Sequence, residues 1–286
     1  MHWWRTLLLL TGIVFSLPVL ASCEVTDDAG HHLKLPHPAK RIVVLAPDLV
    51  EDMFAIGAGS QVIAVVKGSD YPRAANKILQ VGSYSGIDLE RIVTLKPDLI
   101  IAWKYGFTRQ IAVLRELGFP VYISAPSKLE DVPHLLQQLG CLTGKTASAD
   151  AAAREFEQSI SQLAAVKRKP LKVFFQIDTY TLQTINQDSW INQVLALCGG
   201  QNVFADANII APVVSREAVF VANPDVILND STNDSWKKTW QSWPEIQAVK
   251  SQHLYTVTPD LIARAGPRLV KGARQVCDYL DAARKG

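Results

Sequence analysis

Residues 90–101 read Glu-Arg-Ile-Val-Thr-Leu-Lys-Pro-Asp-Leu-Ile-Ile, and residues 217–228 read Glu-Ala-Val-Phe-Val-Ala-Asn-Pro-Asp-Val-Ile-Leu. Both segments have a glutamate, six further residues, a Pro-Asp pair and three aliphatic residues. Each predicts a helix that leads into a buried strand through a Pro-Asp turn. The two copies begin 127 residues apart, which is too far for a stacked repeat protein and therefore indicates two related lobes.

Short apolar runs alternate with helical segments on both sides of this repeat. In the first half, strands are predicted at 41–46, 62–66, 98–102 and 121–123, helices at 49–56 and 108–117, and a hairpin at 25–35. In the second half, the pattern returns at 172–177, 190–197, 225–228 and 254–257 and ends in a helix at 268–284. Continuous apolar strands that alternate with helices are typical of parallel sheets covered on both faces. The predicted fold class is therefore α/β, with two Rossmann-like lobes.

One long helix is predicted between the lobes. Residues 145–166 are rich in alanine and contain neither glycine nor proline, which corresponds to a helix of roughly 33 Å. The basic run Lys167-Arg-Lys169 follows and suits a helix C-terminus. We therefore expect an N-terminal α/β lobe at 23–144, a bridging helix at 145–168 and a C-terminal α/β lobe at 169–286.

The first residues predict export from the cytoplasm. No charged residue occurs from Thr6 to Cys23, and this apolar run follows Arg5 and ends in small side chains. Its length and composition predict a signal peptide at 1–22 rather than a membrane span, which needs about 20 apolar residues. Two processing routes remain open. Leu20-Ala-Ser-Cys23 resembles a lipobox, which would place a lipid on Cys23, and Val19-Leu-Ala21 fits cleavage to a soluble protein.

Four cysteines occur in the chain. A disulfide persists outside the cytosol, and Cys198 and Cys277 lie in the same half of the chain, so we expect these two to pair. If Cys23 carries a lipid, Cys141 is left over. Its apolar surroundings at 135–142 then predict a buried free thiol.

Composition and motifs argue against several other functions. The 29 Lys and Arg residues and 27 Asp and Glu residues leave a net charge of +2, which gives no reason to expect a nucleic-acid partner. The chain contains no Gly-x-Ser-x-Gly and no His-Glu-x-x-His motif, so an exported hydrolase or other enzyme is not the expected function. His31, His32 and His37 are the basis for a metal-ion carrier as an alternative. They lie in and beside the predicted hairpin without a matching Cys or carboxylate spacing, so no metal site is expected.

A set of segments together resembles the helical-backbone class of periplasmic binding proteins, which handle ferric siderophores, haem and cobalamin. These segments are 25–35, 41–47, Asp70-Tyr-Pro72, 88–103 and Cys198-Gly-Gly-Gln-Asn-Val-Phe204. Ile101-Ala-Trp103, Ser215-Arg-Glu217 and the positions of Cys198 and Cys277 are most similar to the cobalamin-binding branch. The resemblance implies a monomeric periplasmic carrier without a catalytic cofactor. Such a carrier hands its ligand to the permease of an ABC importer, whose associated ATPases supply the energy.

The resemblance also implies roles for particular residues. Glu90 and Glu217, each two positions after a residue that can cap a helix, match the family's docking points for arginines on the permease. The ligand is expected in the cleft between the lobes, at the carboxyl ends of the strands. Its contacts are expected to come from Tyr71, Tyr84, Trp103, Asp260, Leu261, Ile262, Ala263 and Arg264.

The chain departs from the cobalamin binders at several positions around this cleft. Gly68 stands where an aromatic residue is usual, Leu261 and Ile262 replace aromatic residues, and Ala211-Pro212 lacks a tryptophan. The pocket is therefore expected to be less aromatic. Cobalamin or a related corrinoid is the predicted ligand, and haem or a ferric siderophore is the alternative.

Overall fold

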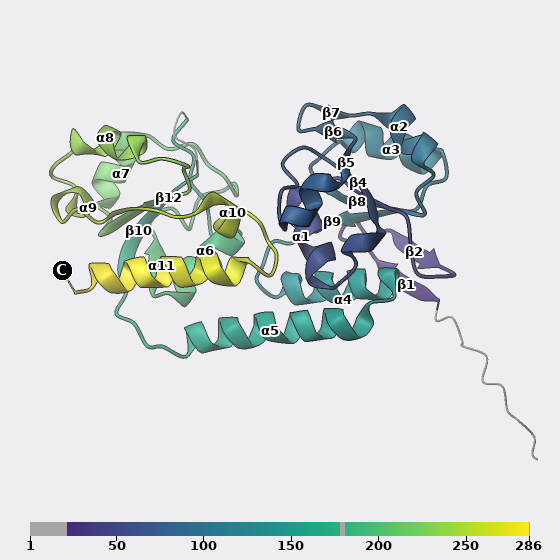
Figure 1. Ribbon diagram of the computed structural model, residues 1–286. Coiled ribbons are helices and arrows are strands. Elements are labelled where there is room, and N and C mark those ends of the chain that lie inside the picture. The colour runs from purple at the N-terminus through teal and green to yellow at the C-terminus, as the bar shows by residue number, and fades with distance from the viewer. Residues whose placement is uncertain (1–21, 178–180, 286) are drawn as a thin grey trace, which may run out of the picture.

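The computed structural model describes residues 22–177 and 181–285. The signal peptide predicted at 1–22 therefore lies, apart from Ser22, outside the described residues. Figure 1 shows two lobes, each built around its own sheet, with the helix α5 (Thr146–Ala164) running beneath both. The predicted α/β fold class with two lobes is confirmed.

The N-terminal lobe contains a five-stranded sheet in the order β5-β4-β3-β8-β9, in which all neighbouring strands are parallel. Its strands are β3 (Ile42–Val44), β4 (Val62–Val65), β5 (Leu79–Gln80), β8 (Leu99–Trp103) and β9 (Val121–Ser124). Alternate residues of β3 face opposite cores, because Ile42 and Val44 pack with one set of helices and Val43 with another. The first set is α1 (Pro47–Ala55) and α4 (Asp131–Thr143), and the second is α2 (Leu89–Leu95) and α3 (Thr108–Glu116).

Smaller elements complete this lobe. The predicted hairpin is formed by β1 (Cys23–Thr26) and β2 (His32–Leu35), and a second hairpin by β6 (Gly82–Ser83) and β7 (Gly86–Ile87). Two short 3-10 helices, η1 (Gly59–Gln61) and η2 (Arg73–Lys77), lie between the strands.

The C-terminal lobe contains a four-stranded parallel sheet in the order β11-β10-β12-β13. The strands are β10 (Leu171–Gln176), β11 (Gly200–Asn202), β12 (Val226–Asn229) and β13 (Leu254–Thr256). The helices are α6 (Trp190–Leu197), α7 (Arg216–Ala222), α8 (Ser235–Gln241), α9 (Gln247–Lys250), α10 (Pro259–Ile262) and α11 (Leu269–Ala283). Val173 and Phe175 of β10 pack with α6 and α11, whereas Phe174 packs with α7 and α8, so helices again cover both faces.

The repeated sequence has the same structural role in both lobes. The carboxylate of Asp98 accepts a hydrogen bond of 2.8 Å from the backbone N–H of Arg41, directly before β3. The carboxylate of Asp225 accepts one of 2.8 Å from the backbone N–H of Lys172, in β10. Each Pro-Asp turn therefore anchors the beginning of the neighbouring strand. The strand order follows one plan, β4-β3-β8-β9 in one lobe and β11-β10-β12-β13 in the other.

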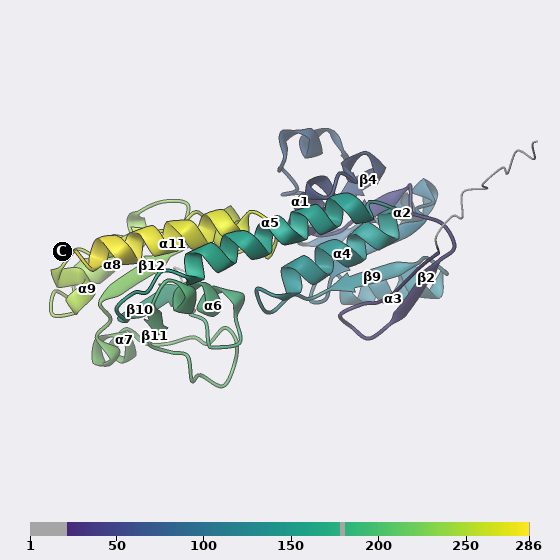
Figure 2. The same cartoon turned by 90° about the horizontal axis from the view of Figure 1, so that it is seen from below.

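The helix α5 connects the lobes along one side of the molecule. It packs against α4 of the N-terminal lobe and contacts α11 of the C-terminal lobe. Figure 2 shows α11 beside the second half of α5. The observed helix, Thr146–Ala164, falls within the segment 145–166 that the composition predicted as helical. Within residues 22–177 and 181–285, no helix has both the length and the apolar character that a bilayer crossing requires.

Two disulfides join the four cysteines. Cys198, at the end of α6, is bonded to Cys277 of α11, which is the pair that the sequence led us to expect. The other bond corrects the predictions for the remaining cysteines, because Cys23 of β1 is bonded to Cys141 of α4. The reason is that the first hairpin packs on α4. Cys141 is therefore not a free thiol, and the sulfur of Cys23 is not free to carry a lipid thioether.

Candidate functional site

A cavity of about 550 Å³ lies between the two lobes, at the carboxyl ends of the strands of the N-terminal lobe. The residues at the ends of β3, β4 and β8 form most of its wall, namely 45–48, 66–67, 103 and 105–107, together with Tyr84. Trp190, Ala263 and Arg264 complete it from the C-terminal lobe. Parallel strands end at one edge of a sheet, so loops that are distant in sequence meet there. A cavity of this size is typical of a small-molecule site.

Aromatic side chains dominate the exposed wall of this cavity. The rings of Trp103 and Tyr105 meet edge to face with their centroids 5.1 Å apart. Tyr84 stands on the turn between β6 and β7 and is 96% exposed. Trp190 adds a ring from the other lobe, and its Nε1 donates a hydrogen bond of 2.9 Å to the backbone oxygen of Ile262. Exposed aromatic faces gathered at a cavity suit the flat, apolar face of a ligand.

The predicted ligand contacts divide into two groups. Four of them line the cavity: Tyr84, Trp103, Ala263 and Arg264. Tyr71 is instead covered by the guanidinium of Arg268, whose central carbon lies 3.8 Å from the ring centroid. Asp260 is not in the cavity wall either, and it forms an ion pair of 2.9 Å with Arg264.

The two aliphatic residues of the predicted loop do not line the cavity. Ile262 is fully buried in the core of the molecule, which corrects its prediction as a ligand contact. It ends α10, which packs against α11, and this packing directs the side chain inward. Leu261 is half-buried and does not line the cavity.

Sequence reasoning missed several residues of the wall. Those with a polar, aromatic or proline side chain are Pro47, Asp48, Lys67, Tyr105, Phe107 and Trp190. All except Trp190 closely follow a predicted strand, and that position is the signal that identifies them. Trp190 begins α6 and carries no such signal.

The histidines considered for a metal site make other contacts. His31 Nδ1 lies 3.1 Å from Asp27 Oδ1, and His32 Nδ1 lies 3.0 Å from Thr26 Oγ1. In the part of the chain that the structure describes, no group of three or more His, Cys, Asp and Glu residues is arranged to hold a metal ion.

Three acidic residues of α1, Asp48, Glu51 and Asp52, lie near the junction of the lobes. Burial raises the pKa of Asp48, which lines the cavity, and also that of Glu51. Asp52 is fully buried, and neither of its carboxylate oxygens has a hydrogen-bond partner among the described residues. Burial, followed by the charges of Asp48 and Glu51, raises the pKa of Asp52 well above its usual range. Asp52 therefore stays protonated to a higher pH than an exposed aspartate.

We expect Asp52→Asn to stabilise the protein at alkaline pH. Between the ordinary aspartate pKa of about 3.9 and the raised folded-state pKa, the folded protein binds more protons than the unfolded chain. The free energy of unfolding therefore decreases as pH rises through this window. Above this window, the free energy of unfolding of the variant should exceed that of the unchanged protein by about 1.4 kcal/mol for each unit by which the pKa of Asp52 is raised. Urea unfolding from pH 4 to pH 9 measures this profile.

Asp278→Asn is the matched control for this experiment, because it replaces an exposed carboxylate of α11. Its pH profile should follow that of the unchanged protein. If Asp52→Asn gives the same profile as Asp278→Asn, the buried carboxyl group of Asp52 does not have the assigned effect.

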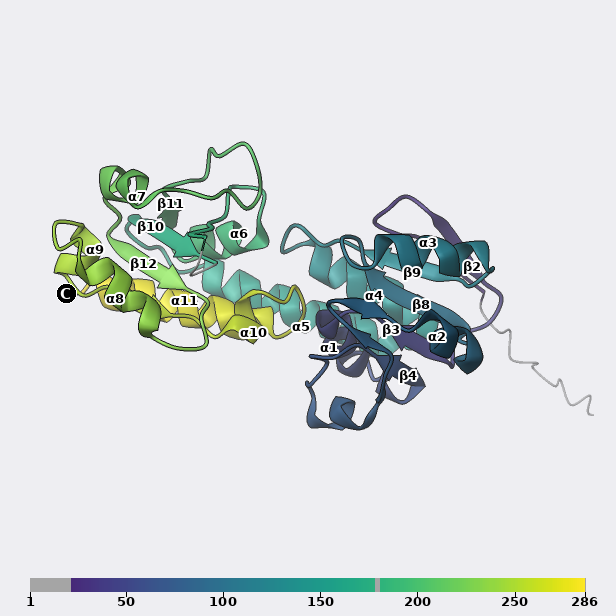
Figure 3. The same cartoon turned by 90° about the horizontal axis from the view of Figure 1, so that it is seen from above.

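Glu90 and Glu217 occupy matching exposed positions in the two lobes. The helix of each begins with a side-chain cap. Asp88 Oδ1 accepts a hydrogen bond of 2.9 Å from the N–H of Arg91, and Ser215 Oγ accepts one of 3.1 Å from that of Ala218. Figures 1 and 3 show α2 and α7 on the side of the molecule away from α5, one on each lobe.

The pKa of Glu217 is held below its usual range, chiefly by its own backbone N–H and then by the hydroxyl of Ser215. Glu217 therefore carries its charge at neutral pH. Each lobe thus presents an exposed glutamate in the first turn of a capped helix. These two helices, α2 and α7, lie on one common side of the molecule (Figure 3).

Residues 42–261 match the family model described as periplasmic binding protein. The chain is 35% identical over 270 residues to the vitamin B12-binding protein of Vibrio cholerae serotype O1. The aligned region covers 93% of this chain and 98% of that protein. The crystal structure of the periplasmic vitamin B12 binding protein BtuF of Vibrio cholerae is similar, with a TM-score of 0.79 and 35% identity. It covers 87% of this chain and 99% of that chain.

A second solved structure is that of the periplasmic heme-binding protein RhuT from Roseiflexus sp. RS-1 in apo form. Its TM-score is 0.74 at 25% identity, and the match covers 86% of this chain and 99% of that chain. The family match extends across the two parallel sheets and the helix α5 between them, so it covers parts of both lobes. The chain belongs to the periplasmic binding protein family.

Proposed function

We propose that the protein is the substrate-binding component of an ABC importer and carries cobalamin or a related corrinoid in the cavity between its lobes. The observation that carries the ligand class is the exposed aromatic wall formed by Trp103, Tyr105 and Tyr84. The ligand stated in the names of the Vibrio cholerae relative and of the similar crystal structure supports the same proposal.

The chemistry of the wall fits the two kinds of surface that a corrin presents. A corrin is a large flat disc with apolar faces and a rim of amide groups. The aromatic rings cover an apolar face, and burying such a face is favourable. Asp48, Lys67 and Arg264 line the same cavity and supply polar groups for the rim.

Delivery of the ligand depends on exposed charged residues instead of the apolar wall of the cavity. Glu90 and Glu217 each bind an arginine of the permease in the periplasm, one contact per lobe. Paired charged contacts fix orientation and register more than they add affinity. The ATPases of the importer supply the energy of transport, and the binding protein carries out no chemical step.

Calorimetric titration of the ligand-free protein with cobalamin, haemin and a ferric siderophore tests the ligand. Saturable binding of cobalamin at one per chain, tighter than that of the other two, is the expected result. Tighter binding of haemin would favour the haem alternative, which has a structural relative at 25% identity. Binding of none of the three would contradict the proposed function.

Removal of one ring should weaken the complex strongly. We expect Trp103→Ala to lower the affinity for cobalamin about 10- to 100-fold, because a buried aromatic contact contributes about 1.5–3 kcal/mol. Titration calorimetry measures the change. Leu117→Ala, which removes an exposed apolar side chain at the end of α3, is the control and should bind normally. Equal affinities of the two variants would exclude Trp103 from the ligand site.

A further inference from the structure

A network of charged side chains crosses the junction between the lobes. Glu51 lies on α1 of the N-terminal lobe, and its side chain is only 3% exposed. Its Oε1 accepts hydrogen bonds from Arg264 Nη1 at 2.6 Å and from Arg268 Nη1 at 2.9 Å. Both arginines belong to the segment between α10 and α11 of the C-terminal lobe. We call Glu51, Arg264 and Arg268 the lobe latch.

The two arginines also contact a second part of the N-terminal lobe. Arg264 Nη1 lies 3.4 Å from a carboxylate oxygen of Asp70, and the guanidinium of Arg268 covers the ring of Tyr71. The segment between α10 and α11 therefore holds the N-terminal lobe at two places, α1 and the loop at 70–71. Cations stacked on an aromatic ring add to ion pairing in such contacts.

The backbone of this segment also packs closely against α1. A Cβ atom at Gly266 would lie 2.6 Å from a carboxylate oxygen of Asp52, which is closer than atoms can approach without a shift. A side chain at position 266 would therefore have to displace the buried carboxylate of Asp52.

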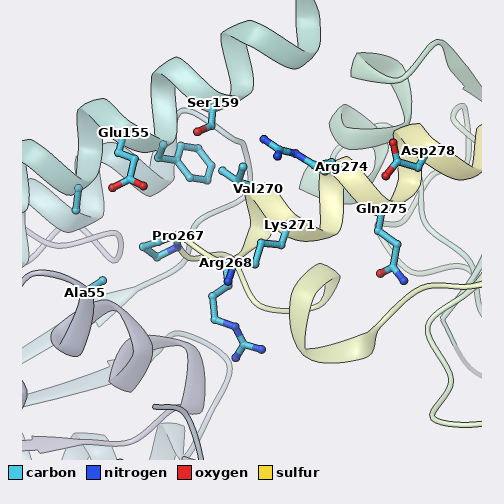
Figure 4. Close-up of a pocket in the computed structure, with 12 residues that line it drawn as sticks. Ala55, Glu155, Ser159, Pro267, Arg268, Val270, Lys271, Arg274, Gln275 and Asp278 are labelled. Atoms are coloured by element: carbon cyan, nitrogen blue, oxygen red, sulfur yellow. The ribbon is translucent and has the colours of Figure 1, made fainter. Parts of the chain in front are cut away.

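The side of the junction that faces α5 is less filled. A cavity of about 640 Å³ lies between α5 and the first turns of α11, with Phe156 and Val270 among its lining residues. Figure 4 shows this cavity, with Arg268 at the beginning of α11 directing its guanidinium away from α5. Along this cavity, α5 and the first turns of α11 are therefore not closely packed, and neither Glu51 nor Arg264 lines it.

We propose that Glu51 is a positioning residue that sets the angle between the lobes through Arg264 and Arg268 before the ligand arrives. Arg264 also lines the ligand cavity, so the same contact fixes one part of the cavity wall. The carboxylate of Glu51 is paired with both guanidinium groups, and loss of its charge leaves the two arginines without their shared partner. The part of the proposal that concerns ligand affinity depends on the proposed function, but the part that concerns lobe geometry does not.

Distance measurement between spin labels tests the geometry without a ligand. Labels attached to cysteines introduced at Leu117 and Lys250 report on one exposed position in each lobe, and all four natural cysteines are held in disulfides. We expect a narrow distribution of distances in the otherwise unchanged protein. Glu51→Gln should broaden this distribution or shift it, and Arg268→Gln should do the same.

Arg274→Gln is the matched control, because Arg274 lies on α11 shortly after Arg268, lines the same cavity beside α5 and forms no ion pair with a described residue. It should leave the distribution of distances unchanged. The double variant Glu51→Gln/Arg268→Gln should broaden the distribution by less than the sum of the two single changes, because both changes break the contact between Glu51 and Arg268. A distribution for Glu51→Gln identical to that of the unchanged protein would overturn the proposal.

Cobalamin titration tests the consequence for binding. Glu51→Gln and Arg268→Gln should each weaken binding by at least about tenfold, although neither residue lines the ligand cavity. Arg274→Gln should bind as the unchanged protein does. Normal affinity in both latch variants would overturn the link between lobe angle and binding. If the unchanged protein binds no cobalamin, the proposed function fails, but the spin-label distances still decide whether the lobe latch sets the angle.

Discussion

Reversing both exposed charges, Glu90→Arg together with Glu217→Arg, is expected to abolish uptake while ligand affinity stays unchanged. Under the proposed docking, each carboxylate would become a positive charge facing an arginine of the permease, and like charges brought together at an interface cost several kcal/mol. Neither residue lines the ligand cavity, so binding should be preserved. Uptake is measured in cells that depend on the variant as their carrier, and affinity is measured by calorimetry on the purified protein.

The control must change the net charge equally without touching α2 or α7. Glu116→Arg with Glu245→Arg meets this condition, because both glutamates are exposed and one lies in each lobe. Uptake should be normal in this control. Equal uptake by the two double variants, whether normal or lost, would remove the specific docking role of Glu90 and Glu217.

Loss of the disulfide between Cys198 and Cys277 should lower the stability of the protein strongly. The bond closes a segment with a sequence separation of 79 between α6 and α11. Restricting the unfolded chain over a loop of this length contributes about 4.5 kcal/mol in the chain-entropy model, and removing native disulfides typically costs 2–5 kcal/mol. We therefore expect Cys198→Ala/Cys277→Ala to lower the free energy of unfolding by about 2–5 kcal/mol in urea titrations.

The disulfide between Cys23 and Cys141 provides an internal comparison. It closes a longer segment, with a separation of 118, and it too lies within a single lobe. Its removal through Cys23→Ala/Cys141→Ala should therefore destabilise the N-terminal lobe by a similar amount. An unchanged free energy of unfolding in both variants would contradict this account of disulfide stabilisation.

The architecture was predictable because its signals are local. The Pro-Asp segments, the helix caps at Asp88 and Ser215 and the run without glycine or proline at 145–166 each depend on neighbouring residues only. The structure explains why these signals recur in both lobes, since Asp98 and Asp225 make equivalent hydrogen bonds to the beginning of a neighbouring strand.

Contacts between distant segments could not be predicted in the same way. The bond between Cys23 and Cys141 depends on the first hairpin packing on α4, and the spacing of the two cysteines carries no sign of that packing. The pairing of Glu51 with Arg264 joins residues 213 positions apart in different lobes. For residues that are neighbours in sequence, prediction failed for a different reason. Ala263 lines the cavity and Ile262 is buried, and a helix of four residues is too short for its periodicity to distinguish them.

The unequal share of the two lobes in the ligand cavity has a kinetic consequence. Among the described residues, the N-terminal lobe contributes the wall residues 45–48, 66–67, 84, 103 and 105–107. The C-terminal lobe contributes only Trp190, Ala263 and Arg264. Under the proposed function, a ligand makes most of its contacts with the N-terminal lobe and few with the C-terminal lobe. Substitutions on either surface should act mainly on the residence time of the ligand, because association rates differ much less than dissociation rates among variants of one binding site. Most positions where such an effect is expected therefore lie on the N-terminal lobe.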